Sequence, residues 1–228
     1  MSGPLVSCVM PTFNRRAFVP YAIRYFQRQD YPDRELLVVD DGTDPVDDLI
    51  PADTRIRYLR LAKRHTIGAK RTLGVHEAAG EFIVHWDDDD WMGPTRVSRQ
   101  VAGLHDVDVS GLSSMSYLDI HSRRCWRYTY PRRLRPWIAE PTFCYHREFG
   151  LRTPFPDQDL AAGTRWLWDN ETVRIRALAD TSFYVGLIHT GNTAIKDTSN
   201  GWWRSVPHRE IANLLGDDWP GPVHDSVR

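Results

Sequence analysis

The chain is poor in cysteine, in long apolar runs and in net charge. Three cysteines lie far apart among 228 residues, so they predict neither a disulfide framework nor a paired metal site. No stretch approaches the roughly 18 consecutive apolar residues of a membrane span, and the N-terminus lacks the regions of a signal peptide. The 29 basic and 30 acidic residues give a net charge of −1, so no overall field recruits nucleic acid. We expect a cytoplasmic protein with no membrane span and no nucleic-acid partner.

Glycine is missing from the turn that follows the first predicted strand. Residues 5–10 form an apolar run, and Pro11-Thr-Phe-Asn14 follows it directly. A dinucleotide-dependent oxidoreductase needs a G-x-G-x-x-G turn at this place. A nucleotidyltransferase, which also uses clustered acids and metal, needs a glycine-rich phosphate loop there. Both classes are therefore disfavoured.

Strand and helix patterns alternate over the first hundred residues. Apolar runs predict strands at 5–10, 36–39, 56–61 and 82–86, and helical spacing predicts helices at 17–29 and 67–79. Such alternation predicts an α/β fold with a single doubly wound, mostly parallel sheet. Three of these strands then end in polar sequence at one edge of the sheet, where ligands bind in such folds.

The pattern changes after about residue 105, which predicts a smaller mixed half. A further strand is expected at 107–110, a hairpin between 117–120 and 125–130, a helix around 166–179 and a strand at 183–188. We expect one continuous domain, residues 1–228, with a nucleotide-binding half at 1–105 and an acceptor-binding half at 106–228.

Four consecutive carboxylates, Asp87 to Asp90, follow the apolar run 82–86. Adjacent carboxylates repel one another, so they need a cation or strong hydrogen-bond donors nearby. Hard oxygen ligands at a strand end suit Mg²⁺ or Mn²⁺ with a phosphate-bearing substrate. The alternative interpretation is a solvated acidic loop or a set of helix N-caps.

Four motifs, in order, resemble those of the family 2 glycosyltransferases. They are Val9-Met-Pro-Thr-Phe-Asn-Arg15, Val38-Val-Asp-Asp-Gly-Thr43, Ile67-Gly-Ala-Lys-Arg-Thr-Leu-Gly74 and residues 82–94 around the acidic run. The resemblance covers residues 5 to about 100 and implies the A-type nucleotide-diphospho-sugar transferase fold (GT-A). It also implies inverting transfer of a sugar from a UDP- or dTDP-sugar to a hydroxyl acceptor, with Mn²⁺ or Mg²⁺ as cofactor. The acceptor class stays open among saccharides, lipid-linked saccharides, peptides and metabolites.

The resemblance assigns the donor and metal sites to particular residues. Asp41 is expected to bind the base or ribose, although Asp-Gly is also an ordinary turn pair. His189 follows an apolar strand and is expected to join Asp89 as a metal ligand; a structural histidine is the alternative. Arg15 is expected on the surface. The residues expected to bind the donor are Pro11, Thr12, Asn14, Asp41, Arg71, Asp87 and Asp88.

The general base is the weak point of the resemblance. Family members carry a Glu-Asp pair just before a short helix, whereas this chain has Ala162-Gly163 there. We expect Asp159 to take the role, with Asp157 next to it as the second candidate. The alternative for Asp159 is a helix N-cap or turn residue. A family member that binds nucleotide sugar without transferring it is therefore the second functional hypothesis.

Residues 121–137 hold six arginines and no acid. Arginine suits bidentate recognition of carboxylate and phosphate, so this segment could bind an acidic acceptor or clamp the leaving diphosphate. Arginine interleaved with aromatic residues also fits nucleic acid. The alternative is a solvated hairpin whose long side chains lie along apolar surface.

Overall fold

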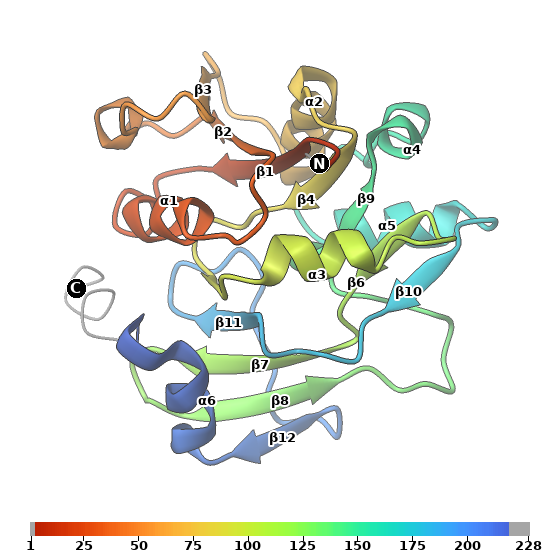
Figure 1. Cartoon of the computed structure of the whole chain (residues 1–228). Helices are drawn as coiled ribbons and strands as arrows, with labels where there is room; N and C mark the ends of the chain where they lie inside the picture. The colour runs from red at the N-terminus through yellow and green to blue at the C-terminus, as the bar shows by residue number, and fades with distance from the viewer. Residues whose placement is uncertain (1–2, 219–228) are drawn as a thin grey trace.

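The computed structural model describes residues 3–218, which form two β-sheets with helices packed around them (Figure 1). The first sheet contains β1 (Val6–Thr12), β2 (Arg34–Asp40), β3 (Ile56–Arg60), β4 (Phe82–His85), β6 (Val109–Gly111), β9 (Cys144–His146) and β10 (Ile175–Ala177). The second contains β5 (Trp91–Met92), β7 (Ser114–Asp119), β8 (Cys125–Thr129), β11 (Tyr184–Ile188) and β12 (Trp203–Val206). The strand orders are β10-β6-β9-β4-β1-β2-β3 and β12-β8-β7-β11-β5.

The first sheet is mostly parallel. Strands β3, β2, β1 and β4 pair in parallel, β9 runs antiparallel to both β4 and β6, and β10 is parallel to β6. Parallel neighbours need crossover connections, here provided by α1 (Val19–Gln27) and α2 (Ile67–Glu77). The doubly wound, mostly parallel sheet and the smaller mixed half are therefore confirmed. The carboxyl ends of β1, β2 and β4 lie side by side.

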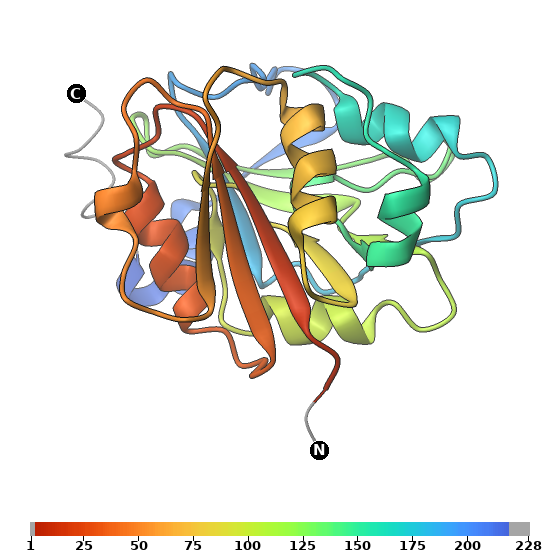
Figure 2. The same ribbon diagram turned by 90° about the horizontal axis from the view of Figure 1, so that it is seen from above.

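Helices cover both faces of this sheet, as Figure 2 shows for α1 and α2. Cys8 and Met10 of β1 point to the α1 side, whereas Val9 packs with Val75 of α2 on the other side. This alternation explains why the strands are apolar at nearly every position. The short helices α4 (Arg147–Arg152) and α5 (Ala162–Asp169) lie on the α2 side, where α5 contributes the buried Trp166.

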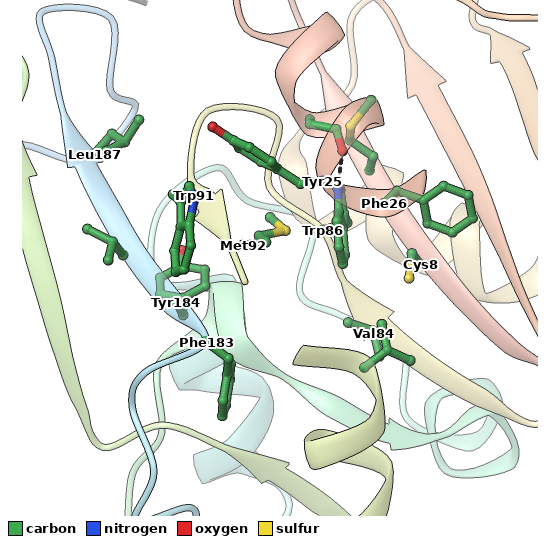
Figure 3. Close-up of a cluster of buried hydrophobic side chains, with 14 of the residues drawn as sticks. Cys8, Tyr25, Phe26, Val84, Trp86, Trp91, Met92, Phe183, Tyr184 and Leu187 are labelled. Atoms are coloured by element: carbon green, nitrogen blue, oxygen red, sulfur yellow. Dashed lines mark hydrogen bonds between the residues drawn. The ribbon is translucent and has the colours of Figure 1, made fainter. Parts of the chain in front are cut away.

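The second sheet packs against the α1 face of the first (Figure 3). Trp86 follows β4 directly and donates a hydrogen bond from its indole nitrogen to the Ala22 carbonyl of α1, at 3.1 Å. Arg96, on α3 (Arg96–Ala102), is fully buried, and its guanidinium lies 5.1 Å from the ring centroids of both Trp86 and Tyr184. The β4–β5 connection, which carries the acidic run, is thus held between two packed layers.

Some elements differ from expectation. The helix expected around 166–179 is α5, Ala162–Asp169, and the residues after it form β10, which pairs in parallel with β6. Arg174, just before β10, hydrogen-bonds Asp108, just before β6. The expected hairpin forms between β7 and β8. The remaining elements are α6 (His208–Leu215), η1 (Asp47–Leu49), η2 (Glu140–Thr142) and η3 (Gly216–Asp218). Among the described residues no helix has both the length and the apolar character needed to cross a bilayer.

Candidate functional site

A cleft of about 510 Å³ opens where β1 and β4 end. The second sheet contributes Tyr117, Tyr184 and Leu187 to its opposite wall. Its remaining lining comes from the end of β1 and the loop after it (Pro11 to Arg15), the start of α2 with the residues before it (Arg64, His65, Ile67, Lys70, Arg71), the acidic run (Asp87 to Asp90), the η2 segment (Glu140, Pro141), the loop before α5 (Asp159, Leu160, Ala161) and the loop after β11 (Gly191 to Ala194, Lys196). Segments far apart in the chain therefore meet around the predicted acidic edge.

The four aspartates of the acidic run have different environments. Asp87 accepts a hydrogen bond from Arg71 Nη2 at 2.8 Å. Asp90 accepts hydrogen bonds from the Tyr184 hydroxyl and, at 2.8 Å, from the Leu187 amide. Burial, and then the charges of Asp89 and Asp87, raise the pKa of Asp90 well above its ordinary value. Burial and the charge of Asp89 raise the pKa of Asp88 to about 8. The raised pKa values of Asp88 and Asp90 show that this part of the cleft holds more carboxylates than its basic side chains balance.

Three of these carboxylates lie close enough together that they could hold a cation. Asp87, Asp89 and Asp90 each offer one oxygen, and these oxygens all lie within 4.8 Å of one another. An all-oxygen donor set of this kind suits Mg²⁺ or Mn²⁺. Asp88 does not belong to this group, whereas Asp90, which had no predicted role, does.

His189 lies beside the acidic run, at the end of β11. Its Nε2 is 3.1 Å from Asp89 Oδ2, and its Nδ1 accepts a hydrogen bond from the Gly191 amide at 3.1 Å. The ring stacks on Phe18, with centroids 4.5 Å apart. This arrangement directs Nε2 at Asp89. Burial acts to raise the pKa of Asp89, but the hydrogen bond from His189 and the charge of Arg15 together hold it below its ordinary value.

Arg15 is in the cleft rather than on the open surface. Its guanidinium lies 3.6 Å from Asp89 and 4.0 Å from Asp88, and it donates a hydrogen bond to the Gly191 carbonyl. Only 15% of its side chain is exposed. The expectation for Arg15 was wrong because sequence pattern does not show that the loop after β11 folds over the loop after β1.

Asp41 is occupied by contacts within the protein. Its Oδ1 lies 2.7 Å from Lys70 Nζ, and its Oδ2 accepts a hydrogen bond from the His65 amide at 2.7 Å. Lys70 also donates to the Thr12 carbonyl at 3.0 Å and lines the cleft, whereas Asp41 is absent from the lining. Sequence reasoning gave Lys70 no role; its place in the first turn of the helix, beside Arg71, was the available signal.

Two polar residues after β1 have distinct surroundings. Asn14 has a positive φ of 54°, which asparagine tolerates, and its Oδ1 accepts hydrogen bonds from the Thr43 and Asp44 amides. It therefore ties the turn after β1 to the turn after β2. The buried Thr12 side chain hydrogen-bonds the Asp88 carboxylate, which opposes the rise in the pKa of Asp88. Thr12 also lines the cleft.

Glu140 is a cleft residue that sequence reasoning missed. Its Oε2 accepts a hydrogen bond from the Gly163 amide at 2.7 Å, and its Oε1 lies 3.0 Å from Arg71 Nε. Burial raises its pKa. A Cβ atom on Gly163 would lie 2.5–2.7 Å from the Glu140 side chain, so this carboxylate occupies the space beside the first turn of α5. No local motif marks Glu140, because it reaches the site from η2.

Asp157 and Asp159 both contact the start of α2. Asp159 Oδ1 accepts a hydrogen bond from the Ile67 amide at 3.0 Å, and Asp157 Oδ1 accepts one from the Thr66 hydroxyl at 2.6 Å. Asp159 lines the cleft and 37% of its side chain is exposed, whereas Asp157 is outside the lining. Of the two predicted bases, only Asp159 therefore faces the cleft.

The chain is similar to a known protein family and to several curated proteins. The family model described as glycosyl transferase family 2 matches residues 7–163. The GalNAc(5)-diNAcBac-PP-undecaprenol beta-1,3-glucosyltransferase of Campylobacter jejuni is 36% identical over 93 residues, which are 38% of this chain and 30% of that protein. The chain spans 30–42% of the length of this and two other curated relatives it matches.

Two solved structures share the fold. TarS residues 1–349 of S. aureus, in complex with UDP-GlcNAc, has a TM-score of 0.64 at 20% identity and covers 84% of this chain and 62% of its own. The mannosyltransferase PcManGT of Pyrobaculum calidifontis, in complex with GDP-Man and Mn²⁺, has a TM-score of 0.60 at 17% identity and covers 81% and 56%. At these identities the likeness concerns the fold, which is GT-A-like.

Proposed function

Because the chain belongs to glycosyl transferase family 2, we propose that it transfers a sugar from a nucleotide-diphosphate donor to a hydroxyl acceptor, with inversion and with a divalent cation. The observation that carries this proposal is the set of three carboxylate oxygens within 4.8 Å of one another. They lie in a cleft that also contains Arg15, Lys70 and Arg71, whose charges suit a diphosphate.

Donor binding is assigned to the loop after β1 and the start of α2. Pro11, Thr12 and Asn14, which line the cleft, would hold the nucleoside. Asp41 would act through Lys70, which it positions at the cleft wall. UDP- and dTDP-sugars are the proposed donors, and the UDP-GlcNAc bound to TarS supports a uridine donor.

The cation, Mn²⁺ or Mg²⁺, would be held by Asp89 with His189, and Asp87 and Asp90 offer the neighbouring oxygens. When bound, it would stabilise the charge that develops on the leaving diphosphate. Arg71 orients Asp87, and Asp88 would reach the ribose. The Mn²⁺ bound to PcManGT supports this choice of ion.

The general base would be Asp159. As the acceptor oxygen bonds to the anomeric carbon, the bond from that carbon to the diphosphate breaks and the hydroxyl proton passes to the carboxylate. Glu140 is the second carboxylate of the cleft that could accept this proton. Measuring turnover and donor affinity in both Asp159→Asn and Glu140→Gln distinguishes the two candidates. The variant that still binds donor but has lost transfer identifies the base.

A second candidate function is donor binding without transfer. It is favoured by the first turn of α5, where Ala162 and Gly163 offer no carboxylate, and by the contact of Asp159 with the α2 amide. This candidate predicts metal-dependent nucleotide binding with no release of sugar from the donor above an Asp89→Ala background.

Calorimetric titration with UDP, dTDP and GDP, each with Mn²⁺ and with excess chelator, tests the proposal. We expect one nucleotide to bind with Mn²⁺, and binding to disappear with chelator and in Asp89→Ala. Asp47→Ala removes an exposed carboxylate outside the cleft and should bind normally. Equal affinity of the wild type and Asp89→Ala would refute the metal site.

A further inference from the structure

A second groove lies away from the donor cleft, on the outer part of the second sheet. It has a volume of about 510 Å³. Its lining comes from β8, the chain that follows β8, and the start of β12: Arg127, Thr129, Pro131, Arg133, Gly201, Trp202 and Arg204. Strands β8 and β12 lie at the bottom of Figure 1, on the far side of the second sheet from β1. We call this feature the arginine groove.

The arginine groove concentrates positive charge. Its lining includes three arginines and no carboxylate. Arg127 donates hydrogen bonds to Glu210 at 2.8 Å and to the Thr181 hydroxyl at 2.6 Å, whereas the exposed Arg133 and Arg204 form no salt bridge within residues 3–218. Arg204 also lies directly opposite Arg127 in the β12–β8 pairing. Like charges at such positions destabilise a sheet; Glu210 offsets the charge of Arg127, and an anion beside Arg204 would offset the charge that remains.

A chain of aromatic rings runs from Trp202, at the edge of the arginine groove, to the donor cleft, along the face of the second sheet opposite to Arg127 and Arg204. Trp202, which is 39% exposed, lines the groove, and Tyr117 lines the cleft. Between them, the ring centroids of Trp202 and Tyr128 are 6.2 Å apart, those of Tyr128 and Trp203 are 5.1 Å apart, and those of Trp203 and Tyr117 are 4.7 Å apart. Tyr128 and Trp203 are half-buried. An exposed aromatic ring such as that of Trp202 packs well against a sugar ring, because a sugar also presents an apolar face.

We propose that the arginine groove binds the acidic group of a saccharide acceptor whose other end enters the donor cleft. The inference rests on the proposed function, since it names the substrate class of the same transfer. Guanidinium groups bind carboxylate and phosphate in a bidentate manner, so either acid would serve. Arg127 and Arg133 of the arginine-rich segment thereby gain a role, and Trp202 at the edge of the groove offers a ring to the part of the acceptor that turns toward the cleft.

The test is calorimetric titration of the whole chain with three probes: hexagalacturonate, a glycerol-phosphate hexamer and neutral maltohexaose. At least one acidic probe should bind, and maltohexaose should bind at least tenfold more weakly. The double variant Arg133→Ala/Arg204→Ala should weaken the acidic probe at least tenfold. The two acidic probes tell a carboxylate ligand from a phosphate ligand.

A variant outside the groove controls for the loss of one positive charge and is compared with the single variants Arg133→Ala and Arg204→Ala. Arg123→Asn removes an exposed arginine from the β7–β8 turn, outside the groove, and asparagine tolerates its positive φ of 58°. It should bind the acidic probe as the wild type does. Failure of both acidic probes to bind, equal binding of maltohexaose, or an equal loss in Arg123→Asn would overturn the inference. UDP titration with Mn²⁺ in the same variants reports the donor cleft separately, so loss of the donor site is distinguished from loss of the groove.

Discussion

Asparagine in place of Asp41 would leave a buried lysine without its anionic partner. Lys70 Nζ lies 2.7 Å from Asp41 Oδ1, and the exposed fractions of the two side chains are 4% and 0%. Removing one partner from a buried ion pair costs roughly 3–5 kcal/mol of unfolding free energy. Lys70 would keep its hydrogen bond to the Thr12 carbonyl. We therefore expect a loss near the lower limit, about 3 kcal/mol.

Urea unfolding followed by tryptophan fluorescence measures this loss of unfolding free energy. Thermal unfolding gives the matching shift in Tm: for a domain of this size each kcal/mol lowers Tm by roughly 2–4 °C, so Asp41→Asn should lower Tm by about 6–12 °C. The slope of unfolding free energy against urea should not change, because the fold is the same. Asp47→Asn alters an exposed carboxylate and should stay within about 0.5 kcal/mol of the wild type.

A double variant separates the ion pair from general disruption. Lys70→Met leaves Asp41 with the hydrogen bond from the His65 amide. Asp41→Asn/Lys70→Met should be more stable than the sum of the two losses predicts, by about 0.5–3 kcal/mol, because it leaves no unpaired buried charge. An unchanged midpoint for Asp41→Asn, or strict additivity in the double variant, would refute the reasoning.

Three further results are expected. Gly163→Ala should lower the unfolding free energy by about 1–3 kcal/mol, because its Cβ would lie 2.5–2.7 Å from the side chain packed against it; Gly201→Ala, with no atom within 4 Å of its Cβ, should stay within about 0.5 kcal/mol, and equal losses would contradict the packing argument. Asp159→Asn should retain UDP binding and lose about 10²–10⁴-fold in transfer, measured as UDP release, whereas full transfer would exclude it as the base. Burial raises the pKa of Cys8 to about 12 and of Cys125 to about 11, and it also raises that of Cys144. A disulfide reagent at pH 8 should therefore label the native protein slowly and the urea-unfolded protein fast; fast labelling of these thiols in the native state would show that they are accessible.

The first half of the fold could be predicted because its signals are local. Strands β1, β2 and β4 are buried on both faces, so their residues are apolar in continuous runs that any window reveals. The short strand β9 was missed because it has three residues and joins β4 to β6 by pairing with both. Nothing within Cys144–His146 itself predicts that it will be inserted between two strands.

The sequence by itself determined the family, the α/β class and the place of the acidic run at the carboxyl edge of the sheet. These follow from neighbouring residues, because strand ends and motifs are short-range features. Only the tertiary structure decided that Asp41 is held by Lys70, that Glu140 lies against Gly163, and that an aromatic path leads from the cleft to the arginine groove. These contacts join segments distant in the chain, and they form only when packing brings burial, charge and shape together in one place.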